Sequence, residues 1–142
     1  MFLSGEMLTA QRLNRLQPKT YRAVATSTLV GAASSADVPG ASVTLTTETA
    51  SAIYVVDAWF DYDLTGATTL LGSGNVAVDG VIHTEFAVFQ ANVANDRSSV
   101  GHTYRGTLGA AGSHTLKLVA SPVASQTVNI YSSITVTIYE EV

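Results

Sequence analysis

The sequence contains no cysteine and little charge. Of its 142 residues, only 13% are Asp, Glu, Lys or Arg. The missing cysteines exclude a disulfide framework and any zinc site built on thiolates. About a quarter of a typical soluble domain is charged, so Thr, Ser, Asn, Gly and Ala must cover much of this surface. Such a surface suits permanent assemblies and extracellular particles, and also a weakly charged monomer.

Long apolar runs and export signals are also missing. No stretch approaches the roughly 18 apolar residues of a membrane span, so we expect no membrane insertion. The opening MFLSGEMLTA has no basic region, no sustained apolar segment and an early glutamate, and these features do not fit a secretory signal peptide. We therefore expect synthesis in a cytoplasm without export by that route.

Motifs for cofactors and catalysis are not found either. The sequence has no phosphate-binding loop, no dinucleotide fingerprint and no G-x-S-x-G elbow. His83, His102 and His114 are scattered without metal-ligand spacing, and we expect each to be a half-buried strand residue. We expect no catalytic residue, cofactor or metal ion. A Ser–His–Asp triad assembles in space, so a hydrolase stays open as the third hypothesis, which predicts a polar pocket with a His–carboxylate pair.

One short motif, DYDLTG at 61–66, resembles the start of a calcium loop because Asp61 and Asp63 are two positions apart. An EF-hand also needs an acidic or amide residue at its fifth position and glutamate at its twelfth. Thr65 and Gly72 occupy those positions. The favoured interpretation is a polar turn after a strand, and ion binding by the two aspartates stays open.

Positive charge is concentrated near the start of the chain. Four of the seven basic residues lie in the first 22 positions, beside one acid; they are Arg12, Arg15, Lys19 and Arg22. The remainder holds three basic and ten acidic residues, which argues against nucleic-acid binding by that part. Basic residues mixed with leucines are more typical of a docking segment.

A short helix is predicted over residues 10–16. Thr9 suits the N-cap position, and Leu8 and Leu13 have the spacing of a hydrophobic staple. Pro18 ends the segment because it disfavours helical geometry at the residue before it. A helix of about two turns is marginal in water, so its leucines need a surface to pack on: this domain, a sister subunit or another protein. The predicted docking residues are Leu8, Leu13 and Leu16.

From residue 21 onward the apolar pattern has the period of two that is typical of strands. Between the expected strands lie frequent turn signals, including a loop at 31–40 and the hairpin signal Asp79-Gly80. Seven to nine short strands after one helix predict an antiparallel β-sandwich. The predicted domains are a helical anchor, residues 1–20, and a β-sandwich, residues 21–142. Strands are expected at 21–30, 41–48, 51–62, within 75–89, twice within 102–121, and at 127–140.

Alternation along the strands also assigns faces. The set expected on one face of 51–62 is Tyr54, Val56, Ala58, Phe60 and Tyr62. The set expected inward in 127–140 is Val128, Ile130, Ile134, Val136 and Ile138. Tyr131 and Tyr139 then share an outer face without charge, which suits a subunit interface or an ordinary surface strand. They are the candidate interface residues.

Aromatic residues allow a second interpretation. Trp59 and exposed tyrosines could line a sugar-binding surface, because aromatic rings stack on the faces of pyranoses. Tyr and Trp are also enriched in cores and subunit interfaces, and we favour that assignment. A carbohydrate-binding module that recognises a host receptor is the alternative function.

The start of the chain resembles a known family. Residues 2–21, FLSGEMLTAQRLNRLQPKTY, are similar to the F-x-x-G-E-x-L-T-A-x-x-L-N segment of many tail-fibre and minor structural proteins of tailed bacteriophages. The matching residues are Phe2, Gly5, Glu6, Leu8, Thr9, Ala10, Leu13 and Asn14. Residues 36–69 and 103–121 resemble the small β domain that follows this segment in phages of actinobacteria.

This resemblance implies a non-enzymatic virion structural protein. In that family the helical segment lies at the attachment end, and the β domain projects outward, commonly as a trimeric jelly-roll of the TNF-like type. The implied partners are other virion proteins of capsid or tail and further copies of this chain in a homotrimer, with a host surface glycan as a further candidate. The implied location is the virion, assembled in the bacterial cytoplasm.

The chain differs from a full tail fibre because it has no long shaft, collagen-like repeat or heptad coiled coil. A minor tail or fibre protein and a capsid decoration or head fibre are therefore equally consistent with it.

Overall fold

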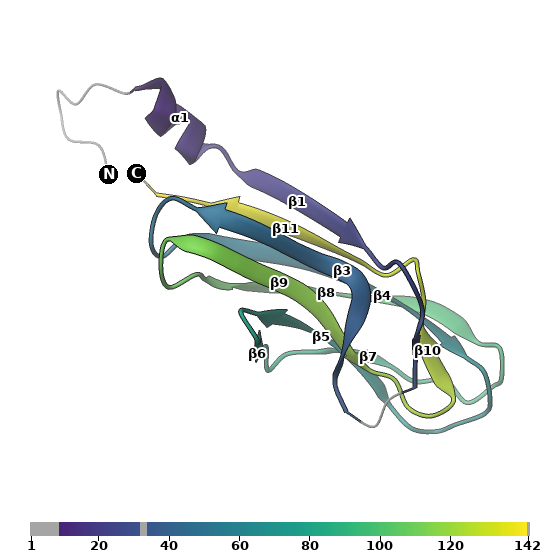
Figure 1. Cartoon of the computed structure of the whole chain (residues 1–142). Coiled ribbons are helices and arrows are strands. Elements are labelled where there is room, and N and C mark those ends of the chain that lie inside the picture. The colour runs from purple at the N-terminus through teal and green to yellow at the C-terminus, as the bar shows by residue number, and fades with distance from the viewer. Residues whose placement is uncertain (1–8, 32–33, 142) are drawn as a thin grey trace.

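The computed structural model describes residues 9–31 and 34–141. Within these ranges one short helix precedes eleven strands (Figure 1). The elements are α1 (Ala10–Leu16), β1 (Lys19–Val24), β2 (Leu29–Val30), β3 (Ala36–Thr47), β4 (Ile53–Leu64), β5 (Gly72–Val78), β6 (Val81–Ile82), β7 (Ala87–Phe89), β8 (Arg97–Thr107), β9 (Gly112–Ser121), β10 (Gln126–Val128) and β11 (Ser133–Tyr139).

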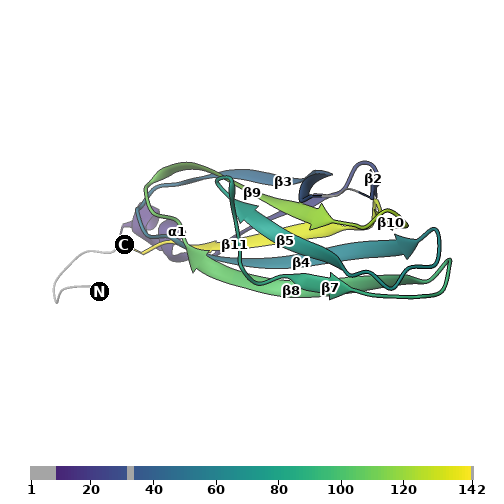
Figure 2. The ribbon, with the colours of Figure 1, turned by 90° about the horizontal axis from the view of Figure 1, so that it is seen from below.

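The strands form two antiparallel sheets that pack face to face (Figure 2). In the first, called sheet A, β4 pairs with β8 along one edge and with β11 and then β10 along the other. β1 extends this sheet beyond β11, and β2 extends it beyond β10. The second, called sheet B, has the order β3-β9-β5-β6, and β7 also pairs with β5. The predicted antiparallel β-sandwich is confirmed.

The core lies between the sheets and follows the alternation seen in the sequence. The residues predicted to share one face of β4 are each 5% exposed or less, so this face is the inward one: Tyr54, Val56, Ala58, Phe60 and Tyr62. Tyr62 stacks on Phe89 of sheet B with 5.0 Å between ring centroids. A Cβ at Gly74 would lie 2.7 Å from the Phe60 ring, so glycine lets this ring approach the backbone of β5. Aromatic packing therefore fixes the two sheets against each other.

The predicted hairpin at Asp79-Gly80 is confirmed. Val78 pairs with Val81 across it, and both turn residues have positive φ, 49° for Asp79 and 84° for Gly80. Positive φ at both central residues is the requirement of a type I′ turn, whose twist matches that of the flanking strands.

Two predicted strands are each broken in two. Residues 21–30 form β1 and β2, and residues 127–140 form β10 and β11. The breaks face each other, because β1 pairs with β11 and β2 with β10, and the backbone N–H of Ala25 donates to the carbonyl of Ser132. The prediction that Ile130 faces inward is wrong. It lies in the turn between β10 and β11 and is 45% exposed.

The prediction of a loop at 31–40 is wrong for its second half, because β3 begins at Ala36. The register with β9 shifts between Asp37 and Ser42. A bulge of this kind tolerates the proline and glycine at 39 and 40 within a strand. Gly40 has a φ of 79°, a left-handed conformation that glycine adopts without a steric penalty.

Candidate functional site

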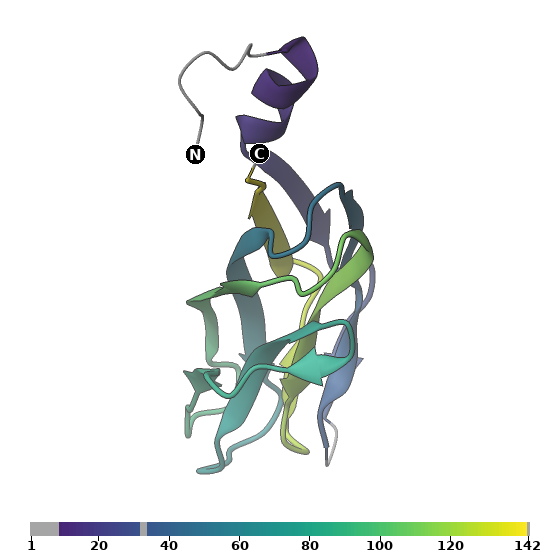
Figure 3. The same cartoon turned by 90° about the vertical axis from the view of Figure 1, so that its left-hand side faces the viewer.

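The helix α1 stands at one end of the sandwich, beside the C-terminal end of β11 (Figure 3). Thr9 caps it as predicted, its hydroxyl accepting from the N–H of Arg12 at 3.3 Å. The helix buries none of its residues: Leu13 is 50% exposed and Leu16 is 41% exposed. The third predicted docking residue, Leu8, lies outside the described residues. The two described leucines therefore do not pack into the core of this domain.

Two ion pairs tie the helix and β1 to the body. Arg15 Nε lies 3.0 Å from Glu48 Oε2, and Lys19 Nζ donates to Glu140 Oε2 at 3.0 Å. Glu140 is buried and also accepts from the N–H of Thr49 at 3.0 Å. The base of the helix is thus fixed, while its leucines remain available.

The second candidate surface is the outer face of sheet A, which points away from sheet B. Its exposed apolar side chains include Val24, Val30, Trp59, Tyr131 and Tyr139. Threonines lie between them, and Thr20 contacts Thr137 at 3.3 Å across β1 and β11. The exposed charges Arg22 and Asp57 flank Thr135 in one cross-strand row. Both candidate interface residues, Tyr131 and Tyr139, therefore belong to one face that carries Trp59 at its middle.

Trp59 lies flat on β8. It is 52% exposed and pairs with Gly101, where a Cβ would lie 3.1 Å from the indole ring. Beside the ring is an open hollow bordered by Asp57, Thr103 and Thr135, in which the Thr103 hydroxyl donates to Asp57 at 2.7 Å. The hollow offers a ring face next to hydrogen-bonding groups.

The two aspartates of the calcium-like motif lie within β4, not in a turn after it, because the strand continues to Leu64. Asp61 is 3% exposed and accepts two hydrogen bonds from Arg97, at 2.9 and 2.6 Å. The guanidinium of Arg97 also lies over the ring of Tyr131, 5.0 Å from its centroid. Asp63 is the register partner of Arg97. Both carboxylate oxygens of Asp61 thus accept from Arg97. The first aspartate of the calcium-like motif is therefore part of an ion pair.

The histidines make pairs that the sequence does not reveal. His114, buried in β9, places Nδ1 2.6 Å from Asp79 Oδ2 and Nε2 3.0 Å from the carbonyl of Ala110. The hydrogen bond to Asp79 raises the pKa of His114. His83 is half-buried but follows β6, so its assignment to a strand is wrong; it contacts Glu85 through Nδ1 and Tyr54 through Nε2.

Both pairs are of the kind that the hydrolase hypothesis predicts. In each, however, the second ring nitrogen faces a backbone carbonyl or a tyrosine hydroxyl, not a serine. The arrangement therefore supplies no activated serine at either histidine. The third histidine, His102, is half-buried in β8 with its ring centroid 4.7 Å from that of Tyr104.

Sequence reasoning identified Trp59 but missed Gly101 and Arg97. A glycine inside a strand pattern signals a close approach of another group, so Gly101 carried a usable signal. Arg97 had none, because the sequence does not show which strand lies beside β4. Over residues 9–31 and 34–141, no helix is long and apolar enough to cross a bilayer.

Comparison with known proteins gives similarity in fold. No family model matches the sequence, and no curated protein matches it. A crystal structure of murine APRIL matches with a TM-score of 0.56 at 10% identity, over 87% of this chain and 100% of that chain. A structure of infectious bursal disease virus, Gt strain, matches with a TM-score of 0.53 at 14% identity, over 87% of this chain and 33% of that chain. PorU from Porphyromonas gingivalis matches with a TM-score of 0.53 at 8% identity, over 87% of this chain and 13% of that chain.

The chain therefore spans one whole neighbour but a third or less of the other two. At these identities the comparisons establish architecture alone. The fold is a TNF-like jelly-roll sandwich preceded by a short helix, as predicted.

Proposed function

We propose that this chain is a non-enzymatic phage virion structural protein, anchored to the particle by its N-terminal segment and projecting the β-sandwich as a knob. The observation that carries the proposal is α1, which buries none of its residues and exposes Leu13 and Leu16. A seven-residue helix is marginal in water without a packing partner. The phage-like motif of residues 2–14 supports a particle protein of capsid or tail as that partner.

The proposal includes a homotrimer formed through the outer face of sheet A. This face combines the aromatic residues Trp59, Tyr131 and Tyr139 with apolar Val24 and with threonines, and it also carries the charged residues Arg22 and Asp57. Aromatic residues are enriched in protein interfaces, and the three rings on this face support it as the subunit contact. The helix would then point from one end of the trimer toward the particle.

The test compares two exposed leucines at opposite ends of the molecule. In a phage that carries the gene, Leu13→Asp should abolish incorporation of the protein into purified particles, measured by immunoblot. Leu70→Asp is the matched control, because Leu70 is 61% exposed in the loop before β5 and should be incorporated normally. Circular dichroism of both purified variants should show an intact β domain. Normal incorporation of Leu13→Asp would contradict the anchoring proposal.

A second candidate function, glycan binding, rests on the Trp59 hollow. The exposed indole face and the adjacent Asp57 and Thr103 offer an apolar platform with hydrogen-bonding groups beside it. Trp59 is the single tryptophan, so its fluorescence reports this site directly. Saturable fluorescence changes on titration with host cell-wall oligosaccharides, lost in Gly101→Val, would favour this candidate. Blue-shifted emission that moves to the red on dilution would favour burial of Trp59 between subunits.

A further inference from the structure

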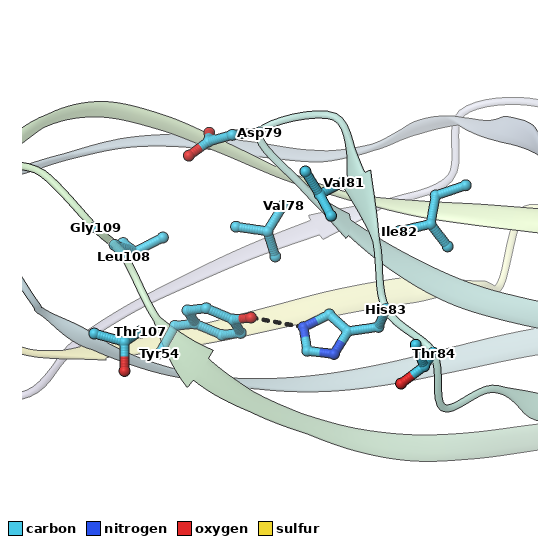
Figure 4. A pocket seen from close by; sticks show the side chains of 10 residues that line it. All are labelled: Tyr54, Val78, Asp79, Val81, Ile82, His83, Thr84, Thr107, Leu108 and Gly109. Atoms are coloured by element: carbon cyan, nitrogen blue, oxygen red, sulfur yellow. Dashed lines mark hydrogen bonds between the residues drawn. The ribbon is translucent and has the colours of Figure 1, made fainter.

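A pocket of about 480 Å³ opens at the edge of the sandwich, between the β5–β6 hairpin and the connection from β8 to β9 (Figure 4). This volume lies within the range of small-molecule sites, roughly 300–1,000 Å³. The pocket does not belong to either candidate surface described above. Its lining residues come from β4, from the β5–β6 hairpin and from the segment after β8.

The floor of the pocket depends on a glycine. Tyr54 of β4 pairs with Gly106 of β8, and a Cβ at 106 would collide with the tyrosine hydroxyl. Glycine therefore leaves the space in which the Tyr54 ring lies across β8 and reaches His83. The Tyr54 hydroxyl meets His83 Nε2 at 2.6 Å, and the two rings pack edge to face with 5.8 Å between centroids. A strand of sheet A and the segment that follows β6 thus supply one fixed polar contact.

Hydrogen-bond chemistry sets the direction of this contact. Glu85 Oε2 lies 3.4 Å from His83 Nδ1, and an ionised carboxylate can only accept, so in the neutral tautomer that donates to Glu85 the ring proton is on Nδ1. Nε2 then accepts from the Tyr54 hydroxyl. Burial raises the pKa of Tyr54, so the hydroxyl retains that proton at neutral pH. The Tyr54 hydroxyl proton is therefore used in the hydrogen bond to His83. The Tyr54 oxygen keeps a lone pair that can accept a hydrogen bond from a ligand.

The remaining walls are mainly apolar: Val78, Val81, Ile82 and Leu108. They suit a ring or a branched aliphatic chain. One carboxylate, Asp79, lines the pocket, and Glu85 lies beside it in contact with His83. Both disfavour an anion. Asp79 already accepts from the N–H of Thr115 and contacts His114, so an ammonium ion would find no unpaired carboxylate among the lining residues.

We infer that this pocket binds a small uncharged alcohol, whose apolar body lies between the β5–β6 hairpin and Leu108 and whose hydroxyl donates to the Tyr54 oxygen. The inference goes beyond the proposed virion function and is independent of it, because the pocket involves neither α1 nor the outer face of sheet A.

The test uses three probes that share one ring and differ in charge. Cyclohexylmethanol, cyclohexanecarboxylate and cyclohexylmethylammonium are titrated into the full-length ¹⁵N-labelled protein, and amide chemical shifts are followed. Cyclohexylmethanol should give saturable shifts concentrated in residues 78–84 and 107–109, and the two ions should bind more weakly by about tenfold or more. Equal binding of all three probes, or no saturable shift with the alcohol, would overturn the inference.

Two variants separate the polar contact from the apolar walls. Tyr54→Phe removes the acceptor and should weaken alcohol binding by roughly three- to tenfold, the usual net effect of one hydrogen bond. Val81→Trp places a larger side chain at the pocket rim, because Val81 shares the face of its register partner Val78 and is 72% exposed (Figure 4), and it should abolish binding without disturbing the core. Tyr131→Phe, on the outer face of sheet A, is the control. If Tyr54→Phe fails to fold, unchanged binding by Val81→Trp still overturns the assignment.

Discussion

The carboxylate of Glu140 joins segments that are remote in sequence. It accepts from Lys19 at the start of β1 and from the N–H of Thr49 after β3. Burial alone would raise its pKa, but the hydrogen bonds from Lys19, Thr49 and Glu48 outweigh burial and hold the pKa of Glu140 below its usual value. A lowered pKa in the folded state means that the ionised carboxylate stabilises the protein above pH 4.5, the ordinary pKa of this group. That stabilisation is lost as the pH falls through the lower, folded-state pKa.

Replacing Glu140 tests whether its ionised carboxylate stabilises the folded protein. Glu140→Gln should lower the free energy of unfolding at pH 7 by roughly 1.5–3 kcal/mol, because it weakens hydrogen bonds to a buried charged group. The difference between wild type and variant should shrink as the pH is lowered below about 4.5. Urea unfolding followed by circular dichroism at several pH values measures it. A difference that stays constant down to pH 3 would contradict the role given to the ionised carboxylate.

Residue-level predictions from sequence succeed where alternation is uninterrupted. Tyr54 to Tyr62 alternates over a single strand, and the five residues predicted to share one face are all buried. Ile130 has the same parity as its neighbours in 127–140, but it lies in a turn, where parity has no meaning. The contacts between Asp61 and Arg97 and between Tyr54 and His83 join residues that are far apart in sequence, so no local pattern could reveal them.

At the scale of elements, α1 and β1 differ in how they are held. The helix is joined to the body through the partly exposed ion pair of Arg15 with Glu48, whereas β1 contributes a full register with β11 and the Lys19–Glu140 contact. Local signals predicted the helix well, since its cap and its stop are encoded within a few residues. They could not predict the breaks in 21–30 and 127–140, because each break is set by the strand opposite.

This difference predicts unequal effects of two truncations. Removing residues 1–17 should lower the free energy of unfolding by less than about 1 kcal/mol, because the helix buries none of its residues and its ion pair with Glu48 is partly exposed. Removing residues 1–20 also removes Lys19 and leaves Glu140 buried without its cation, so a further loss of roughly 1–3 kcal/mol is expected. Urea unfolding of the two truncated chains at equal concentration measures both. Equal stabilities would contradict the separate roles of helix and strand.

At the scale of the whole molecule, the oligomeric state shows whether copies of the chain associate through the outer face of sheet A or through α1. If the outer face of sheet A forms the trimer, the full chain and the chain lacking residues 1–17 should both have three times the monomer mass of 14.8 kDa, corrected for the truncation. Light scattering measures this. Trp59→Asp should give monomers, whereas Leu70→Asp should not.

Other outcomes would change the assignment. A trimer formed only by the full-length chain would make the helix the assembly device. Monomers in both cases would contradict the trimer and would favour a monomeric glycan-binding module centred on Trp59.

The placement of α1 beside the end of β11 has a practical consequence for engineering. If the helix holds the protein on a particle, a fluorescent label fused after the last strand would be crowded against the attachment point. The connection between β4 and β5 lies at the opposite end of the sandwich (Figure 2). A peptide inserted between Gly66 and Ala67 would instead be presented at the far tip, accessible to an antibody. The chain is thus suited to surface display through an internal loop.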